Sequence, residues 1–358
     1  MTASKIRVAV NGYGVIGKRV ADAIRVQLDM ELIGVADVVS DYRVKVAAAL
    51  DLPLYASLPE KVGEMKAAGL PIRGTLEDLL TQVDAVVDCT PKGIAAKNLE
   101  RYRTLSIKSV FQGGEKHSLT NHSFVAQANY ATALGRDTTR VVSCNTTSIV
   151  RTLGALSQAG LLKKARGVLI RRATDPWESD HSGIMNTVVP EKDIPSHQGP
   201  DAQTVLPDLD VVTIAMKAAQ TTSHLHAWSV ELTRSATKDE VLAAFRAVPR
   251  IAFLRIADGI VALNSTLEMM ADLGRPRGDM WEVGLWEDSL TVTGNEAFYT
   301  YQVYNQAIVV PETIDALRAL TGAEQNGMRS IATTDQALGL VREFVAPSRE
   351  PVAPVPQR

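Results

Sequence analysis

The sequence predicts an α/β protein with two domains, in which a doubly wound parallel sheet is followed by an α+β domain with a mixed sheet. The chain has 358 residues, which is beyond the size at which a single hydrophobic core usually stops growing. As far as Val142, short apolar runs alternate with amphipathic segments. Beyond that point the apolar runs become longer and the amphipathic segments fewer, which is typical of an α+β domain.

In the first half, buried strands are predicted to alternate with helices. The strands are expected at Ile6–Val10, Leu32–Val35, Ala85–Asp88 and Ser109–Phe111. The helices are expected between them, at Lys18–Val26, Arg43–Leu50 and Ala95–Arg103. Because successive strands are joined by helices, right-handed crossovers and parallel pairing are expected.

The second half is predicted to contain longer strands, at Gly167–Ala173, Asp210–Ala218, Ala227–Thr233 and Ser289–Thr293. Helices are expected at Lys238–Ala247 and Thr266–Leu273. A further helix is predicted to begin at Pro311 and to stop at Gly322, and a last one to cover Thr334–Phe344. The proline-rich tail at residues 347–358 is expected to be disordered.

Composition and charge exclude several classes of protein. The formal net charge of −2 provides no field that would attract nucleic acid or an anionic membrane. The two cysteines, Cys89 and Cys144, lie far apart, which argues against a disulfide scaffold and a zinc site, so no metal is expected. No apolar stretch approaches the roughly 18 residues of a membrane span. The N-terminus leads directly into a predicted strand and leaves no room for a signal peptide, so we expect a cytoplasmic protein.

A glycine-rich motif follows the first predicted strand. The segment Asn11-Gly12-Tyr13-Gly14-Val15-Ile16-Gly17 fits the pattern G-x-G-x-x-G and is followed directly by a predicted helix. Gly12 would allow the tight turn, Gly14 the approach of a pyrophosphate, and Gly17 close packing of helix on strand. The first N–H groups of the helix, beginning at Val15 and Ile16, would bind the phosphates. The motif therefore predicts a Rossmann dinucleotide-binding domain.

Asp37 follows Gly17 by 20 positions, at the end of the second predicted strand. An acidic side chain at this place hydrogen-bonds the adenosine ribose hydroxyls of NAD. A 2′-phosphate would meet the carboxylate there, so NAD is expected to be preferred, with NADP as the alternative. The simpler interpretation of Asp37 is a solvated residue at a strand end.

Cys144 lies where a nucleophile would be expected, between a predicted strand and a predicted helix. The strand is the largely β-branched run Thr138–Val142. Thr146 and Thr147 are predicted as N-cap residues of the helix. The positive end of a helix dipole favours the thiolate, which is the nucleophilic form of cysteine. The alternative is a buried, inert cysteine.

Several further segments point to one known family when they are taken together and in order. They are Val10–Val20, Phe111–Lys116, Ser123–Tyr130, Val141–Thr147, Ile170–Pro176, Ile194–Asp201 and Val309–Ala316. In these segments the chain resembles the archaeal-type (type II) phosphorylating glyceraldehyde-3-phosphate dehydrogenases. The resemblance implies a Rossmann domain over residues 1–143 and a catalytic domain over residues 144–310. It also implies a C-terminal helical segment, residues 311–346, that packs back on the first domain, and a homotetramer.

The resemblance implies that Cys144 attacks an aldehyde carbon to form a hemithioacetal. A base then takes the hydroxyl proton as hydride leaves for the nicotinamide, and inorganic phosphate cleaves the resulting thioester. The chain has six histidines, of which the resemblance selects His224 as the base. His224 and His226 would share one face of a strand, so one of the two could be purely structural.

The resemblance also assigns the residues that contact cofactor and phosphate. Arg171 and Arg172 would alternate across a strand, and the resemblance assigns Arg172 to the cofactor and Arg171 to the substrate; a surface ion-pair feature is the alternative. Gly114 and Asn305 are further expected cofactor contacts. The other expected contacts with the phosphorylated aldehyde and inorganic phosphate are Ser143, Asn145, Thr146, Thr147, His197 and Gln198.

Three positions depart from the family pattern. Gln198 replaces a second histidine, and Ala36-Asp37 replaces a Thr-Lys pair suited to NADP. The run Tyr304-Asn305-Gln306-Ala307 replaces His-Gln-Glu-Ser, so the nicotinamide-contacting glutamine becomes Asn305, or its role moves to Gln306.

These departures do not affect the expected chemistry, but they leave the identity of the aldehyde substrate undecided. The leading interpretation is glyceraldehyde 3-phosphate, and the alternative is another phosphorylated short aldehyde such as erythrose 4-phosphate. A nucleotide-binding protein without catalysis is a third interpretation, against which Cys144 and His224 argue. The segment Ile194–Asp201 does not fit the pattern of the semialdehyde dehydrogenases of amino-acid synthesis, which argues against that class of enzyme.

Overall fold

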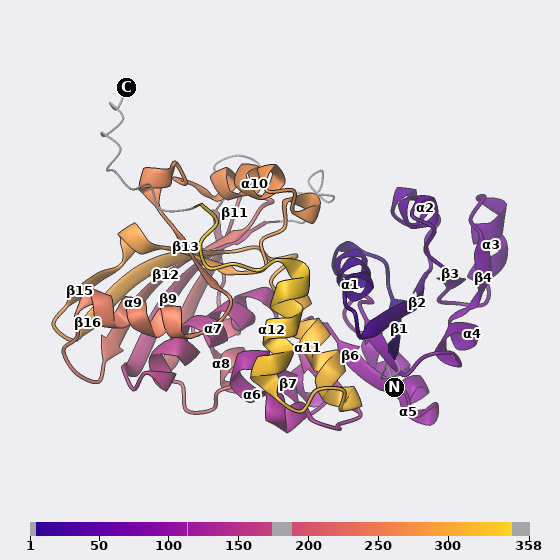
Figure 1. The fold of residues 1–358 in the computed structure, drawn as a ribbon, viewed down its shortest axis with the longest axis horizontal. Helices are drawn as coiled ribbons and strands as arrows, with labels where there is room; N and C mark the ends of the chain where they lie inside the picture. The colour runs from indigo at the N-terminus through magenta and orange to yellow at the C-terminus, as the bar shows by residue number, and fades with distance from the viewer. Residues whose placement is uncertain (1–4, 113, 174–187, 346–358) are drawn as a thin grey trace. The chain divides into compact units, whose positions relative to one another are not determined.

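The computed structural model describes residues 5–112, 114–173 and 188–345 (Figure 1). Gly113, the end of the matching segment Ile170–Pro176, His181 and the tail at residues 347–358 lie outside the described residues. The chain forms two compact units. The first comprises the chain up to Val150 with Asp201–Asp208 and Gln306–Gly339, and the second comprises Arg151–Pro200, Leu209–Asn305 and the chain from Leu340.

This division differs from the predicted boundaries at four places. Residues 144–150, Asp201–Asp208 and residues 306–310, which were expected in the second domain, belong to the first unit. The residues from Leu340 onward, expected with the first domain, belong to the second unit. Two of the changes between units, after Val150 and after Pro200, fall inside the helices Cys144–Gln158 and Gln198–Gln203, where no break in the sequence pattern marks the change.

The first unit contains an eight-stranded sheet in the described part of the chain. Its strands are β1 (Ile6–Asn11), β2 (Met30–Asp37), β3 (Leu54–Ala56), β4 (Ile72–Thr75), β5 (Ala85–Asp88), β6 (Lys108–Phe111), β7 (Ser123–Phe124) and β8 (Thr138–Val141). Every neighbouring pair is parallel, which confirms the predicted doubly wound sheet. The order β4-β3-β2-β1-β5-β6-β8-β7 reverses between β1 and β5, and ligands of such sheets bind at the carboxyl ends of the strands beside the reversal.

The helices of this sheet are α1 (Val15–Arg25), α2 (Tyr42–Ala49), α3 (Lys61–Ala67), α4 (Leu76–Leu80), α5 (Ala95–Thr104) and α6 (Ala126–Ala133). The predicted helices α1, α2 and α5 are confirmed, with ends that differ by a few residues. β3, β4, β7, α3, α4 and α6 were not expected, because they are short and show little periodicity. The core is formed by central strands such as β5, in which all four residues are buried.

Two C-terminal helices complete the first unit, α11 (Val309–Thr321) and α12 (Gly327–Leu338). α11 lies against α1, α6 and β6 (Figure 1), and its residues from Val309 to Leu320 are all buried. It ends at Gly322, as expected, where φ is 70°. The predicted helix Thr334–Phe344 is wrong: α12 begins after the N-cap Asn326 and ends before Gly339, where the backbone is again left-handed.

The second unit contains a mixed sheet, as predicted. Its strands are β9 (Leu162–Arg172), β10 (Val188–Pro190), β11 (Val211–Ala218), β12 (His224–Leu232), β13 (Ile251–Leu254), β14 (Val283–Trp286), β15 (Thr291–Thr293) and β16 (Glu296–Val303). Their order is β10-β11-β9-β12-β16-β14-β13, with β15 paired to β16. β9 and β11 are parallel, whereas β12 is antiparallel to both of its neighbours, β9 and β16.

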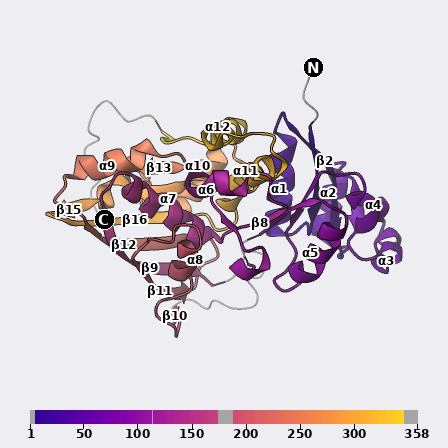
Figure 2. The same ribbon diagram turned by 90° about the horizontal axis from the view of Figure 1, so that it is seen from below.

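The remaining helices are α7 (Cys144–Gln158), α8 (Gln198–Gln203), α9 (Lys238–Ala247) and α10 (Leu263–Asp272). α9 agrees residue for residue with the prediction and lies along the sheet of the second unit (Figure 2). Its Phe245 packs on Tyr299 of β16, with ring centroids 5.2 Å apart. Across the described residues, no helix combines the length and the apolar character that crossing a membrane requires.

Candidate active site

The carboxyl ends of the parallel strands gather several of the predicted site residues of the first unit at one edge. Since all pairs in this sheet are parallel, the segments that follow the strands emerge on the same side. The residues at this edge are the glycine-rich loop after β1, Asp37 at the end of β2, Cys89 after β5, Gly114 after β6 and Cys144 after β8.

The glycine-rich loop has a geometry that only small residues permit at two of its positions. Gly12 has φ of 95°, and a Cβ there would come within 2.8 Å of the backbone carbonyl of Cys89. A Cβ on Gly17 would lie 1.8 Å from the carbonyl oxygen of Gly12. Gly14 differs, because a Cβ there would meet nothing within 4 Å. The loop is thus packed tightly at its base and open at Gly14, where α1 begins without a side-chain cap.

Asp37 holds this loop through its carboxylate. The backbone N–H of Tyr13 donates to Oδ2 of Asp37 at 2.7 Å, and the N–H of Val38 donates to Oδ1 at 2.6 Å. A carboxylate offers about four lone-pair directions, so these bonds leave it able to accept a hydroxyl as well. Asp37 is therefore more than the solvated strand end that the simpler interpretation assumed.

A buried polar network lies beside the loop, and its only sign in the sequence is an acidic residue at a strand end. Tyr102 of α5 donates to Oδ2 of Asp88 at 2.8 Å, and Asn11 donates to the Tyr102 hydroxyl at 2.9 Å. Asn98 donates to the same carboxylate oxygen at 2.8 Å. The network ties the ends of β1 and β5 together at the reversal of strand order.

Cys144 is the first residue of α7, and Ser143 is its N-cap. The Ser143 hydroxyl accepts the N–H of Thr146 at 3.4 Å, and its carbonyl accepts the N–H of Thr147 at 2.8 Å. The prediction that Thr146 and Thr147 cap the helix is wrong: the helix starts earlier, because Ser143 provides the capping oxygen. Cys144 is half-buried and in no disulfide, so it lies directly at the positive end of the helix dipole.

The Thr146 hydroxyl already donates to a carboxylate. Its hydrogen goes to Oδ2 of Asp201 at 2.8 Å, and the other oxygen of Asp201 accepts from the buried guanidinium of Arg140. The Ser143 hydroxyl lies 2.9 Å from Thr146 Oγ1 and must be the donor in that pair, since the Thr146 hydrogen is used. Thr146, Thr147 and Asn145 are buried, so a phosphate would have to displace an existing partner to bind the Thr146 hydroxyl.

The two cysteines differ in environment. Burial raises the pKa of Cys89 well above its usual value, and the nearby Asp88 raises it further. A thiol held protonated is a poor nucleophile. Of the two, only Cys144 lies at a helix N-terminus, which supports it over Cys89 as the reactive residue.

In the second unit, the two histidines of β12 have distinct partners. Nδ1 of His226 lies 2.9 Å from the hydroxyl of Tyr301, and burial lowers the pKa of His226 to about 3. The backbone N–H of Arg172 donates to Nδ1 of His224 at 3.0 Å, which leaves the proton of the neutral ring on Nε2. Burial, followed by the charges of His226, Arg172 and Arg171, lowers the pKa of His224 well below its usual value. His226 therefore has the contacts of a structural residue, and His224 is left as the catalytic candidate.

Arg171, His197 and Gln198 also belong to the second unit, where two of them have a common partner. Arg171 pairs with the carboxylate of Glu191, and Nδ1 of the exposed His197 lies 3.8 Å from the other oxygen of Glu191. Gln198 is fully buried, and neither its amide oxygen nor its amide nitrogen has a hydrogen-bond partner among the described residues. Sequence reasoning missed Glu191, because an acidic residue in a predicted anion site has no motif of its own.

Comparison with known proteins identifies the family. Residues 143–274 match the family model described as glyceraldehyde 3-phosphate dehydrogenase, C-terminal domain. The chain is 43% identical over 337 residues to the glyceraldehyde-3-phosphate dehydrogenase of Methanothermobacter thermautotrophicus, an alignment that covers 94% of this chain and 100% of that protein. It is 42% identical over 340 residues to glyceraldehyde-3-phosphate dehydrogenase 1 of Methanosarcina barkeri, covering 95% and 99%. The enzyme of Methanothermus fervidus is 40% identical over 336 residues, covering 94% and 99%. The chain belongs to the glyceraldehyde-3-phosphate dehydrogenase family.

Members of the glyceraldehyde-3-phosphate dehydrogenase family are dehydrogenases that use a nicotinamide dinucleotide, and the first unit fits that cofactor. The open space at Gly14 admits a pyrophosphate beside the first turn of α1, which carries no acidic side chain. Asp37 lies at the end of the next strand. The glycine-rich loop, the first turn of α1 and Asp37 are thus the residues that would hold the dinucleotide.

Gln306 has a defined partner in the first unit. Its side-chain oxygen accepts a hydrogen bond from Arg19 of α1 at 2.9 Å, and Arg19 also donates to the carbonyl of Val15 at 2.8 Å. This engagement favours Asn305 over Gln306 as the replacement for the family's nicotinamide-contacting glutamine. Asn305 is buried and belongs to the second unit.

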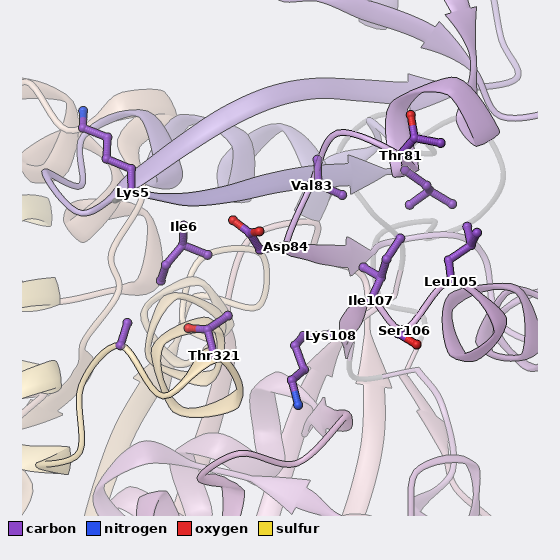
Figure 3. A pocket seen from close by; sticks show the side chains of 12 residues that line it. Lys5, Ile6, Thr81, Val83, Asp84, Leu105, Ser106, Ile107, Lys108 and Thr321 are labelled. Carbon is purple, nitrogen blue, oxygen red and sulfur yellow. The ribbon is translucent and has the colours of Figure 1, made fainter. Parts of the chain in front are cut away.

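A hollow of about 630 Å³ in the first unit lies away from these residues. It is lined by the starts of β1 and β6, by Asp84 just before β5, and by the end of α11 (Figure 3). This is the amino edge of the sheet, opposite the predicted cofactor site. Asp84 accepts from Arg7 and Lys108 donates to Asp137 at 3.0 Å, so both charges are already paired.

Proposed function

We propose that this protein is a phosphorylating dehydrogenase of glyceraldehyde 3-phosphate in which Cys144 is the acylated nucleophile. The observation that carries the proposal is the position of Cys144 as the first residue of α7, at the carboxyl edge of the dinucleotide-binding sheet. The named relatives, which align with nearly the whole chain, support the same substrate. The helix dipole stabilises the thiolate there, and a thiolate attacks an aldehyde carbon directly.

In this proposal His224 donates a hydrogen bond from Nε2 to the alkoxide that forms when the thiolate attacks. The neutral ring with its proton on Nε2, as the bond from Arg172 N–H requires, suits a donor better than the general base expected from the sequence. A bound nicotinamide dinucleotide supplies the hydride acceptor. Once hydride is lost, the alkoxide electron pair forms the carbonyl of a thioester on Cys144. The thiolate is regenerated when the thioester is cleaved, so the proton released in each turnover is the one that the attacking hydrogen phosphate loses.

Phosphate then cleaves the thioester. An oxygen of inorganic phosphate attacks the acyl carbon, the carbon–sulfur bond breaks, and Cys144 leaves as the thiolate with an acyl phosphate as product. Arg171 supplies positive charge, and Arg171 and His197 both supply hydrogen-bond donors suited to a phosphate group. The buried Gln198 amide, which has no partner among the described residues, supports a ligand at this place.

We also propose that NAD is preferred to NADP, that the protein is cytoplasmic, and that it forms a homotetramer. The preference for NAD is supported by the negative charge of Asp37 where a 2′-phosphate would approach. The location and the assembly are supported by the family resemblance alone. Gln198 is an uncharged residue where the family usually has histidine, and this departure leaves erythrose 4-phosphate or another short phosphorylated aldehyde as the second candidate substrate.

Reduction of NAD with each aldehyde, with and without inorganic phosphate or arsenate, tests the proposal. We expect turnover with glyceraldehyde 3-phosphate that depends on phosphate, and a loss of about 10³-fold or more in Cys144→Ser, because a hydroxyl is a far weaker nucleophile than a thiolate. Cys89→Ser is the matched control and should keep most of the activity. Sustained turnover without phosphate or arsenate would exclude the phosphorylating mechanism. Faster turnover with erythrose 4-phosphate than with glyceraldehyde 3-phosphate would assign erythrose 4-phosphate as the substrate instead.

A further inference from the structure

Glu191 places a carboxylate in the anion site predicted for the second unit. It follows β10 directly, and its carboxylate pairs with Arg171 at the end of β9. The second oxygen faces Nδ1 of His197 at 3.8 Å. The two candidates for holding a phosphate, Arg171 and His197, thus lie on either side of one acidic side chain.

The Arg171–Glu191 pair is half-buried, with each side chain 22% exposed. A carboxylate presents oxygens to a guanidinium in the same way as a phosphate does, since both make charge-assisted hydrogen bonds with the arginine N–H groups. The carboxylate therefore uses donors of Arg171 that an anionic ligand would need. A ligand that binds Arg171 through those donors must displace it.

We propose that Glu191 is a specificity-determining residue that competes with the phosphate group for Arg171; this inference rests on the proposed function of Arg171 as a phosphate ligand. A monoanion that replaces the Glu191 carboxylate exchanges one negative charge for another, so its net binding free energy at Arg171 is small. A phosphate dianion carries a second negative charge and a third oxygen acceptor, so its attraction to Arg171 is strong enough to displace the carboxylate. Glu191 thereby excludes weak monoanions from the site and lowers its affinity for phosphate.

The segment that carries Glu191 is suited to moving aside. β10 has three residues, all exposed, and among the described residues its only strand partner is β11. Beyond the strand, the N–H of Glu191 donates to the carbonyl of Ala215 at 2.9 Å. Few buried contacts hold such a segment, so its local opening costs little compared with unfolding of the sheet.

Calorimetric titration of the full-length protein with inorganic phosphate alone tests the proposal. We expect Glu191→Gln to bind phosphate about 3- to 10-fold more tightly than the unaltered protein, because the competing charge is removed. The KM for phosphate should fall by the same factor. Glu231→Gln is the matched control: Glu231 pairs with Lys163 and Lys164 on the same sheet, and its loss should leave the phosphate affinity unchanged.

Unchanged or weaker phosphate binding in Glu191→Gln would overturn the proposal, because Glu191 would then only support Arg171. If the variant does not fold, a crystal structure of the unaltered protein soaked with inorganic phosphate decides the question. The Arg171–Glu191 pair should be open wherever phosphate contacts Arg171, and an intact pair beside bound phosphate would refute competition. The titration measures phosphate binding without turnover, so it is independent of the substrate assay. If Glu191→Gln bound phosphate more tightly but the unaltered protein did not turn over glyceraldehyde 3-phosphate, the proposed function would be overturned and the role of Glu191 would stand.

Discussion

At residue scale, hydrogen-bond donors and acceptors that are already engaged limit what each candidate residue can do. Asp37 closes the glycine-rich loop by accepting the N–H of Tyr13 and keeps lone pairs for a ribose hydroxyl. The Thr146 hydroxyl, by contrast, has given its hydrogen to Asp201. Two residues that look equally polar in the sequence therefore differ in their availability to a ligand.

Asp37→Asn should weaken NAD binding and reduce the preference for NAD over NADP. The amide keeps the size of the side chain but loses its charge and turns one acceptor into a donor. Loss of a charge-assisted hydrogen bond of about 1.5–3 kcal/mol predicts a rise of roughly 10- to 100-fold in the KM for NAD. Steady-state kinetics with both cofactors measures it. Asp84→Asn, at the opposite edge of the sheet, is the control, and an unchanged NAD/NADP ratio in Asp37→Asn would contradict the assigned role.

At the scale of elements, one buried arginine holds the C-terminal helices in the first unit. Arg318 of α11 is 1% exposed and donates to both oxygens of Asp29, at 2.7 and 2.8 Å, just before β2. It also donates to Thr334 of α12, whose hydroxyl donates to the buried Asp315 at 2.6 Å. The network joins two helices near the C-terminus to a strand near the N-terminus.

Arg318→Ala should destabilise the protein by about 3–5 kcal/mol, because removing one partner leaves buried polar and charged groups without compensation. The free energy of unfolding in guanidinium chloride measures this loss. Arg329→Ala on α12 removes a largely exposed arginine that pairs with Glu324, and should cost less than about 1 kcal/mol. If both variants lost the same free energy of unfolding, the buried network would contribute no more to stability than an exposed ion pair does.

At the scale of the whole molecule, buried neutral histidines link stability to pH. Burial lowers the pKa of His122 to about 4 and that of His226 to about 3, and it lowers the pKa of His224 in the same direction. In the unfolded chain these rings titrate near 6.5. Below that pH the unfolded state binds protons that the folded state does not. The stabilisation is therefore complete above pH 6.5 and is lost as the pH falls towards the folded pKa values.

Lowering the pH from 6.5 to 5 should therefore reduce the free energy of unfolding, and His226→Asn should reduce the slope. A fully buried histidine contributes up to about 1.4 kcal/mol per pH unit in this range. Denaturant unfolding at pH 5, 5.5, 6 and 6.5 measures the slope in both proteins. Parallel curves for the variant and the unaltered protein would show that His226 takes up its proton equally in both states.

Local patterns were enough to predict several elements and part of the site. The alternation of apolar and amphipathic segments predicts the parallel sheet, and the predicted limits of α9 agree with the structure to the residue, where Thr237 and Glu240 form a capping box at its start. The glycine-rich loop is predictable because its backbone conformation demands glycine at Gly12. Short strands such as β7 and β10 carry too few residues for any periodicity, so they form only because longer neighbours pair with them.

The sequence by itself determined the fold class, the dinucleotide-binding loop and the candidate Cys144, because each depends on residue types at fixed spacing, and the family resemblance added the candidate His224. Only the tertiary structure decided that Ser143 caps α7, that Asp201 takes the hydrogen of Thr146, and that Glu191 opposes Arg171. It also decided that His226 pairs with Tyr301, while His224 accepts the N–H of Arg172. Apart from the Ser143 cap, which depends on where the helix starts, these are pairings between residues distant in the chain, and they form through strand registers and packing that no local pattern encodes.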